Sequence, residues 1–163
     1  MRRTALSLLA TTALLLLTAQ PDLKSQETLF GIGPKAGLYL KGHPMVGAVA
    51  EIPITRNIYV EPGLELILPG NNTTRITLDL NGRYAFRPRG ESFSPFLLGG
   101  LALATDFVSI NEESATNTSL LFNLGGGLFL NTRSATQYWL GLKAVIGEGD
   151  SDVLLQGGIV WYL

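Results

Sequence analysis

Hydrophobic and polar residues alternate along most of the chain after residue 28. Alternating segments of about ten to fourteen residues are separated by clusters of Gly, Asn, Pro, Ser and charged residues, a spacing typical of antiparallel strands joined by turns. No helical period of apolar residues competes with this pattern. The pattern predicts eight strands, at residues 28–41, 45–54, 58–68, 75–87, 95–108, 119–131, 137–147 and 152–163.

Each predicted strand divides into two sets of side chains, because successive residues of a strand point to opposite faces. In most of the strands one set is apolar, and the other combines glycine with one or two charged residues. In residues 28–41, for example, Ile32 and Leu38 share an uncharged face, whereas Lys35 lies on the other face. Residues 95–108 are apolar on both faces, so the sequence does not decide their orientation.

Two architectures would use eight such strands. A soluble barrel or sandwich turns its apolar face inward, whereas a membrane barrel turns it to lipid. The apolar sets cover about 9 to 11 residues per strand, which is the length of a tilted membrane-spanning strand, whereas soluble strands usually have about 5 or 6 residues. The polar face is also poorer in charge than a water-exposed surface. We therefore predict an all-β fold, an eight-stranded antiparallel up-and-down transmembrane β-barrel, with a soluble secreted lipocalin-like binding barrel as the alternative.

The polar face of such a barrel would fill its interior, because eight strands enclose a space just wide enough for side chains. Charged groups there must pair with one another, since an unpaired buried charge is strongly destabilising. We expect a polar network in the lumen, formed by Lys35, Glu51, Glu61, Glu65, Asp79, Arg83, Lys143 and Gln156.

Composition excludes several classes of partner and site. The chain has 163 residues, of which 46% are hydrophobic and 15% charged, and its formal net charge is -1. Without a basic stripe to neutralise phosphates, nucleic acid is not an expected partner. The chain has no cysteine, which excludes disulfides and thiolate metal sites.

The N-terminus has the layout of a secretory signal. Arg2 and Arg3 precede an apolar run at residues 5–17, and small residues follow near Ala19. The run is shorter than the about 20 apolar residues that a transmembrane helix needs. We predict a signal peptide at residues 1–19, cleaved within a residue or two of Ala19, then a short segment at 20–27 and a barrel domain at 28–163.

The export signal, the eight long strands and a last strand that ends in alternating apolar and aromatic residues resemble the small outer-membrane barrels of Gram-negative bacteria, of the OmpA-like and OmpX-like kind. The resemblance implies export through the general secretory pathway to the outer membrane, and a last strand that pairs with the first and is read by the barrel-assembly machinery. Family members usually end in Phe or Trp, whereas this chain ends in Leu163. The apolar set of this C-terminal assembly strand includes Val153, Leu155, Ile159, Trp161 and Leu163.

The same resemblance implies the partners. They are periplasmic chaperones and the barrel-assembly machinery on the way to the membrane, and outer-membrane lipid and lipopolysaccharide once the barrel is inserted. We expect a monomer. With both termini in the periplasm, as the family implies, the connections at 41–44, 69–74, 109–118 and 147–151 face outward.

The two ends of the barrel differ in predicted charge. The periplasmic turns carry Arg56, Arg87, Arg89 and Arg133, and the outward connections carry Glu112, Glu113, Glu148 and Asp150. The outward acidic residues either bind divalent cations and approach lipopolysaccharide through them, or only keep the loops solvated. Aromatic residues near strand ends either form two interfacial girdles or reflect the strand preference of aromatics. They are Phe30, Tyr59, Phe86, Phe107, Tyr138, Trp139, Trp161 and Tyr162.

The sequence offers little chemistry for catalysis. His43 is the single histidine and lies in a short connection with no serine nearby, whereas a general base needs a nucleophile within reach. One histidine and no cysteine make a poor metal site, and GIGPKAG lacks the spacing of a nucleotide loop. We expect no catalytic, cofactor or metal residues, and predict a non-enzymatic structural or surface-interaction role. The alternatives are a narrow porin-like pore or small-ligand carrier, a lipid-modifying outer-membrane enzyme, and the soluble binding barrel.

Overall fold

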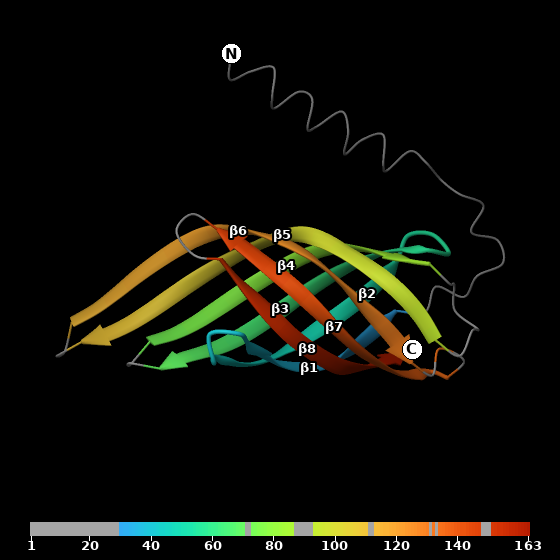
Figure 1. Ribbon diagram of the computed structural model, residues 1–163, viewed down its shortest axis with the longest axis horizontal. Helices are drawn as coiled ribbons and strands as arrows, with labels where there is room; N and C mark the ends of the chain where they lie inside the picture. Colours follow the sequence, from blue (N-terminus) through green and yellow to red (C-terminus); the bar gives the residue numbers. More distant parts are fainter. Residues whose placement is uncertain are drawn as a thin grey trace, which may run out of the picture.

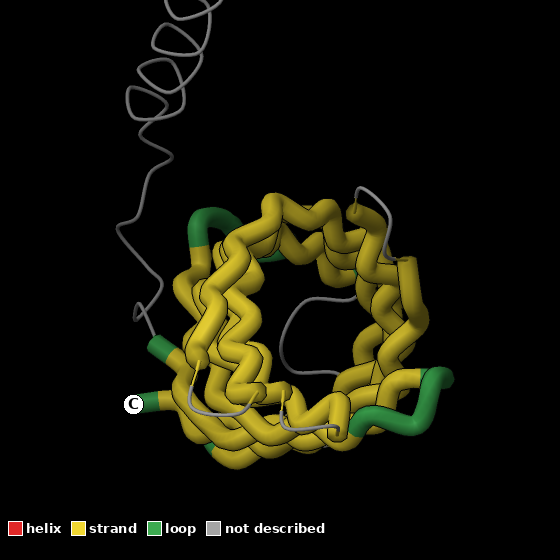
Figure 2. The backbone as a smooth tube through the Cα atoms, turned by 90° about the vertical axis from the view of Figure 1, so that its left-hand side faces the viewer, coloured by secondary structure: helices red, strands yellow, loops and turns green. Residues whose placement is uncertain are grey.

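The eight strands close into a barrel. The computed structural model describes residues 30–70, 73–86, 93–110, 113–130, 132, 134–147 and 151–163. The strands are β1 (Gly31–Tyr39), β2 (Pro44–Pro53), β3 (Ile58–Gly70), β4 (Thr73–Ala85), β5 (Phe93–Ile110), β6 (Glu113–Leu130), β7 (Thr136–Gly147) and β8 (Ser151–Tyr162). Each strand pairs antiparallel with the next and β8 pairs with β1, so that the strands form a ring (Figures 1 and 2). The predicted eight-stranded antiparallel barrel is confirmed.

Other predictions concern residues that the structure leaves undescribed. The predicted signal peptide at 1–19 and the segment at 20–27 lie outside the described residues, and so do Arg87, Arg89, Glu112, Arg133, Glu148 and Asp150. Across the ranges given above, no helix is long and apolar enough to cross a membrane.

The seam between β1 and β8 is paired except at Gly33 and Pro34, where the register has a gap. Partner residues run from Gly31 opposite Tyr162 to Tyr39 opposite Leu154, and beyond the strand the Leu163 amide donates to the Phe30 carbonyl oxygen at 2.9 Å. A Cβ atom on Gly33 would overlap the backbone carbonyl of Ile159. Glycine at this position therefore allows the close approach of the first and last strands at the gap in their register.

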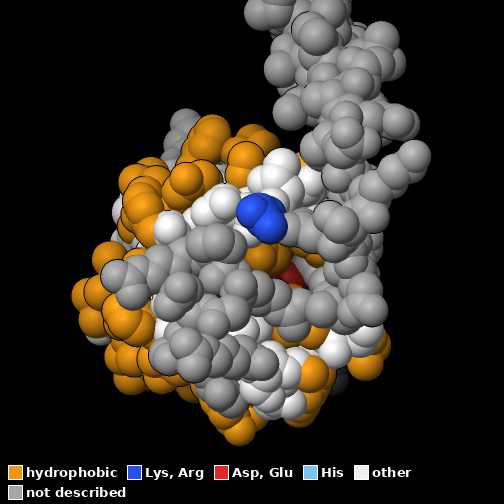
Figure 3. Space-filling model, turned by 90° about the vertical axis from the view of Figure 1, so that its right-hand side faces the viewer, with side chains coloured by type: hydrophobic (Ala, Val, Ile, Leu, Met, Phe, Trp, Pro, Cys, Tyr) orange, Lys and Arg blue, Asp and Glu red, His pale blue; other side chains and the backbone are white. Residues whose placement is uncertain are grey.

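The apolar faces point outward. On β4, Leu78 and Leu80 are 58% and 59% exposed. Asp79, which lies between them, and Arg83, which follows them, are buried. In the view onto the terminal end, hydrophobic side chains lie along the visible outer rim of the barrel (Figure 3). The inside-out arrangement predicted from residue parity is confirmed, and the soluble alternative, which needs the apolar face inward, is wrong.

The structure also settles the orientation of β5, which the sequence left open. Phe96, Leu98, Ala102 and Ala104 are buried in the interior. The alternate residues Leu97, Leu101 and Leu103 are exposed on the outer wall. On β8, Leu155, Trp161 and Leu163 are exposed, and Val153 and Ile159 of the predicted assembly strand are half-buried.

Two apolar clusters pack the interior. One lies toward the end of the barrel opposite the termini, here called the distal end, and contains Tyr39, Met45, Ile67, Ala102, Ala104, Leu121, Val145 and Leu154. The other lies toward the end that holds Phe30 and Leu163, here called the terminal end, and contains Val49, Phe96, Leu98, Phe129, Val160 and Tyr162, with Trp139 packed against it. Along β3, Glu65 and Glu61 follow one another between Ile67 and Tyr59, so charged side chains lie between the ends of the lumen.

The hairpin of β5 and β6 is longer than predicted, so the predicted bounds of the connection, 109–118, are wrong. The strands continue to Ile110 and begin again at Glu113. The Ser, Thr and Asn content of this segment suggests a loop, but ladder pairing continues through Thr105 opposite Thr118 and Ser109 opposite Ser114. A 3.2 Å hydrogen bond between the hydroxyls of Thr105 and Thr118 supports the ladder.

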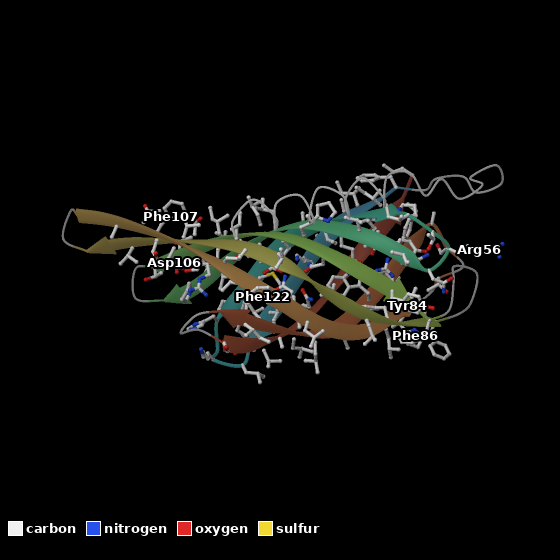
Figure 4. The ribbon with its side chains drawn as sticks, turned by 90° about the horizontal axis from the view of Figure 1, so that it is seen from above. Arg56, Tyr84, Phe86, Asp106, Phe107 and Phe122 are labelled. Atoms are coloured by element: carbon white, nitrogen blue, oxygen red, sulfur yellow. The ribbon has the colours of Figure 1, made fainter. Side chains whose placement is uncertain are left out.

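Six of the eight exposed aromatic residues lie at the terminal end, so the aromatics form one group there rather than two girdles. Tyr59 and Tyr162 are buried in the lumen and Trp139 packs against the inner cluster, so their assignment to a girdle is wrong. The outward-facing aromatics are Phe30, Tyr84, Phe86, Phe93, Phe107, Phe122, Tyr138 and Trp161. Tyr84 and Phe86 lie at the same end as Arg56, and Phe107 lies at the opposite end (Figure 4). The inward aromatics share the parity of Glu61, Lys143 and Gln156, which explains why they face the lumen.

Candidate functional site in the lumen and at its distal end

Two lysines and two carboxylates meet in the lumen and form what is here called the lysine cluster. Lys35 of β1 and Lys143 of β7 each place Nζ 2.6 Å from Glu65 Oε1 and 3.1 Å from Asp79 Oδ2. All four residues are buried. Asn123 of β6 donates to Asp79 Oδ1 at 3.0 Å and to Asn81 Oδ1 at 2.9 Å. The two positive and two negative charges balance, which offsets the cost of burying them.

A second group, here called the arginine cluster, lies closer to the terminal end. Arg83 of β4 donates from Nε to Glu61 Oε1 at 2.5 Å and from Nη2 to Glu51 Oε2. The Tyr162 hydroxyl donates to the same Glu51 oxygen. The guanidinium also lies 4.2 Å from the Tyr59 ring centroid and 4.3 Å from that of Phe129, a geometry that favours a desolvated cation. The cluster therefore links β2, β3, β4 and β8 across the interior.

All eight residues of the predicted lumen set are buried inside the barrel, and seven of them join one of the two clusters. Gln156 joins neither cluster, and its Oε1 atom has no hydrogen-bond partner among the described residues. Sequence reasoning left out Asn123 and the Tyr162 hydroxyl. The parity of Asn123 matches that of the other lumen residues of β6, so this signal was present in the sequence.

Cavities lie on either side of the lysine cluster. A cavity of about 80 Å³ lies at the distal end and is here called the distal cavity. It is lined by Tyr39, Ile67 and Val145, which lie between the distal end and the lysine cluster. A cavity of about 20 Å³ lies beyond the cluster, lined by both lysines, Glu51, Glu61 and Gln156. The smaller space is about large enough for one water molecule. The lysine cluster thus lies between the two cavities and blocks the lumen at this level.

The wall of the distal cavity carries mixed charge. Lys41, His43, Arg75 and Asp152 line it. Arg75 of β4 binds Asp106 of β5 through Nε to Oδ1 at 2.7 Å and Nη2 to Oδ2 at 2.9 Å, a bidentate geometry. The described residues that line this cavity contain no serine, threonine or cysteine, and the described chain contains no cluster of three or more His, Cys, Asp or Glu side chains that could hold a metal ion.

The hairpin of β5 and β6 extends past β7 and β8 at the distal end (Figure 1). The last pair between β6 and β7 is Leu121 with Gly147, whereas pairing between β5 and β6 continues to Ile110 with Glu113. Residues 113–120 of β6, here called the β6 extension, therefore pair with β5 alone among the described strands. Their outer face changes from Leu120 to Thr118 and Thr116, so the extension rises beyond the apolar belt.

Comparisons with known proteins agree with this architecture. The sequence matches no protein-family model and no curated protein. The structure is similar to the N-terminal β-barrel domain of Pseudomonas aeruginosa OprF, with a TM-score of 0.73 and 14% identity over 84% of this chain and 98% of that chain. It is similar to Neisserial surface protein A, with a TM-score of 0.68 and 11% identity over 82% of this chain and 96% of that chain.

The attachment invasion locus protein Ail of Yersinia pestis is a third structure of this kind, with a TM-score of 0.60 and 12% identity over 84% of this chain and 99% of that chain. Ail is described as an outer membrane protein. At these identities the likeness concerns the fold. The chain has the closed eight-stranded fold of transmembrane outer-membrane barrels.

Proposed function

We propose that this protein is a non-enzymatic barrel of the outer membrane of a Gram-negative bacterium, with a structural or surface-interaction role. The observation that carries the proposal is the combination of an apolar outer wall with a lumen closed by buried ion pairs. Such an interior is stable only when a barrel surrounds it, and such a wall is stable only in lipid. The fold shared with OprF, with a Neisserial surface protein and with an attachment protein supports the same role.

The lumen favours a plug over a pore. An ion that crossed the barrel would have to break the contacts of both clusters, because these residues reach across the interior from opposite walls. Breaking such buried pairs costs several kcal/mol. The interior of an eight-stranded barrel is filled by its side chains, and the two cavities that flank the lysine cluster are about 80 and 20 Å³.

The distal cavity offers little support for catalysis. His43 lines it together with Tyr39, Lys41 and Asp152. Acyl transfer that uses a histidine base needs a nucleophilic hydroxyl or thiol within hydrogen-bond reach, and the described lining offers only the phenol of Tyr39. A lipid-modifying activity therefore has little support in this geometry.

The route to the membrane is part of the proposal. The protein is exported through the general secretory pathway, escorted by periplasmic chaperones and inserted by the barrel-assembly machinery as a monomer. Outer-membrane lipid and lipopolysaccharide then surround the belt. The exposed side of β8, with Leu155, Trp161 and Leu163, supports a role for this strand in assembly.

Conductance in a planar lipid bilayer tests the plug. The refolded protein is expected to give no stable channel. The triple variant Glu51→Gln/Glu61→Gln/Arg83→Met removes all three charges of the arginine cluster, so that none of them is left unpaired, and it shows whether this cluster contributes to the block. Steady conductance of the native protein would overturn the plugged lumen and favour the pore. Fractionation of the producing cell, with a heat-dependent gel shift of the outer-membrane fraction, tests the location.

A further inference from the structure

The distal cavity has an apolar wall made by several strands. Its buried lining residues come from β1, β3, β6 and β7 and are Tyr39, Ile67, Leu121 and Val145. These strands are distributed around the ring of the barrel (Figure 2). Farther toward the terminal end, the lysine cluster closes the lumen with ion pairs. A molecule in the cavity would therefore contact apolar side chains on several sides, and it would enter and leave at the distal end.

The hydroxyl of Tyr39 has no hydrogen-bond partner among the described residues. Tyr39 is only 6% exposed, and it lines the distal cavity. A buried hydroxyl that has given up its contacts with water destabilises the fold unless another group binds it. Because the described side chains do not bind this hydroxyl, its partner must lie in the cavity itself.

A rigid turn places a second polar side chain in the same wall. The Tyr39 amide donates to the His43 carbonyl oxygen at 3.0 Å, and the Gly42 amide donates to the Tyr39 carbonyl oxygen at 2.8 Å. Gly42 has a φ angle of 89°, which other residues rarely adopt. The His43 side chain lines the cavity and also makes no hydrogen bond to a described residue. The turn therefore holds a phenol and an imidazole at separate, fixed places in the wall.

The permanent charges of the described residues around the cavity balance. Lys41 and Arg75 line it with one positive charge each, and Asp152 lines it with one negative charge. The second negative charge belongs to Asp106, which binds Arg75 through two hydrogen bonds. With histidine counted as neutral at pH 7, the sum is zero. A charged ligand in this partly buried site would lack a counter-charge, so the balance favours an uncharged one.

We propose that the distal cavity binds a small uncharged molecule in which a short aliphatic group adjoins an amide. The aliphatic group contacts the apolar wall. The amide offers an acceptor oxygen and a donor nitrogen on separate atoms, one for the Tyr39 hydroxyl and one for the His43 imidazole, since a phenol and a neutral imidazole can each donate and accept.

The volume of the cavity limits the size of the ligand. The distal cavity has about 80 Å³, which is about half of the roughly 150 Å³ that hold benzene in an engineered protein cavity. The aliphatic group therefore has about three or four carbon atoms by the same comparison. This inference rests on the proposed plug, because the lysine cluster closes the lumen at the inner side of the site.

A titration followed by NMR spectroscopy tests the class of ligand. The protein is the full barrel in phospholipid nanodiscs, and the backbone amide signals of residues 39–43 report on the turn. The probe is isobutyramide, an isopropyl group joined to an amide. Isobutyrate and isobutyramidinium have nearly the same shape but carry a negative and a positive charge. We expect a millimolar Kd for isobutyramide and binding at least about tenfold weaker for both charged analogues.

A second comparison tests the apolar wall. Acetamide keeps the amide but lacks two methyl groups of isobutyramide. If the aliphatic group contacts the wall, acetamide should bind about tenfold more weakly, because each buried methyl group adds to affinity. Equal binding of the two amides would contradict the aliphatic part of the proposal.

Two variants locate the site. Tyr39→Phe removes only the hydroxyl, which contacts no described side chain, and it should weaken isobutyramide binding at least about threefold. Its matched control is Tyr84→Phe, the same change on the outer wall, which should leave the affinity unchanged. His43→Ala should also weaken binding at least about threefold, and it locates the site even if Tyr39→Phe does not fold. A cold, unboiled gel band checks that each variant forms a barrel.

Three outcomes would overturn the ligand site. No binding of isobutyramide at 100-fold the expected millimolar range would leave only water in the cavity. Equal binding of the charged analogues would remove the uncharged class, and unchanged affinity in the folded variants of Tyr39 and His43 would remove the location. If binding fails while the native barrel does not conduct, only the ligand site is lost. If the native barrel conducts, the plug is lost, whatever the amide does.

Discussion

The lysine cluster and the arginine cluster both stabilise charged side chains buried in the lumen, but they use different groups to do so. The lysine cluster shares two carboxylates between two flexible ammonium groups, so that each of the four charges has two partners. The arginine cluster holds two carboxylates with one planar guanidinium, stacked between aromatic rings, and adds the Tyr162 hydroxyl. The first cluster is redundant and the second is centred on one residue. Stability should therefore depend more strongly on Arg83 than on either lysine.

The largest effect is expected from Arg83→Ala. It removes the central cation and leaves Glu51 and Glu61 buried in a low-dielectric interior, which should destabilise the barrel by about 3–5 kcal/mol. Reversible urea unfolding in detergent or lipid measures the change. Arg83→Lys is the matched variant: it keeps the charge but loses the fork and the stacking, so it should recover only part of the loss. Full recovery by lysine would show that the arginine cluster needs only a positive charge.

A smaller loss is expected from Lys143→Met. Lys35 still binds both Glu65 Oε1 and Asp79 Oδ2, so the variant loses one of two cations and should be destabilised by about 1–3 kcal/mol. The same unfolding measurement applies. A loss as large as that of Arg83→Ala would contradict the redundancy of the lysine cluster. Lys35→Met is the natural companion, because the two lysines contact the same two oxygens and should be nearly equivalent.

The seam gives a third prediction. Tyr162→Phe removes the hydroxyl that donates to Glu51, and the loss of a hydrogen bond to a charged group should cost about 1.5–3 kcal/mol. Tyr59→Phe is the companion variant, because that hydroxyl donates at 3.4 Å to the uncharged carbonyl oxygen of Arg56, whereas the Tyr162 hydroxyl donates to a carboxylate. The measurement is the temperature at which the unboiled gel band disappears. Equal shifts for the two tyrosines would remove Tyr162 from the arginine cluster.

The smallest effect is expected at the distal end. Asp106→Asn weakens the bidentate pair with Arg75, whose side chain is 25% exposed. Partly exposed ion pairs contribute about 0–1 kcal/mol, so the unfolding free energy should change by no more than that. A larger loss would mean that the base of the long hairpin holds the barrel together as strongly as the lumen does.

The lumen residues were predictable because parity alone decides which face of a strand a side chain occupies. Lys35, Glu65 and Lys143 each alternate with apolar neighbours, so the sequence predicted that all three face the lumen. Which of these residues contact one another could not be predicted, because that depends on the stagger between strands in the closed barrel. Nothing in the sequence places Lys35 and Lys143 on the same two oxygen atoms, from strands at opposite ends of the chain.

The structure of two regions could not be predicted from the sequence, for opposite reasons. Residues 95–108 are apolar on both faces, so their pattern carries no orientation, and the structure turns Phe96 and Leu98 inward against the arginine cluster. The β6 extension is polar on both faces, so its composition resembles a loop, and only pairing with β5 makes it a strand. An alternating pattern identifies strands that have one polar and one apolar face. It gives neither the strand nor its orientation where both faces have the same polarity.

The two tryptophans test the central claim most directly, because they lie on opposite sides of the same wall. Trp161 is 44% exposed on the outer face, and Trp139 packs against the inner cluster of Phe96 and Phe129. Single-tryptophan variants, Trp139→Phe and Trp161→Phe, are reconstituted in bilayers that contain brominated lipid, which quenches tryptophan fluorescence by contact. The inside-out barrel predicts strong quenching of Trp161 and little quenching of Trp139. Equal quenching, or quenching of Trp139 alone, would contradict a barrel with its apolar belt on lipid and its charges inside.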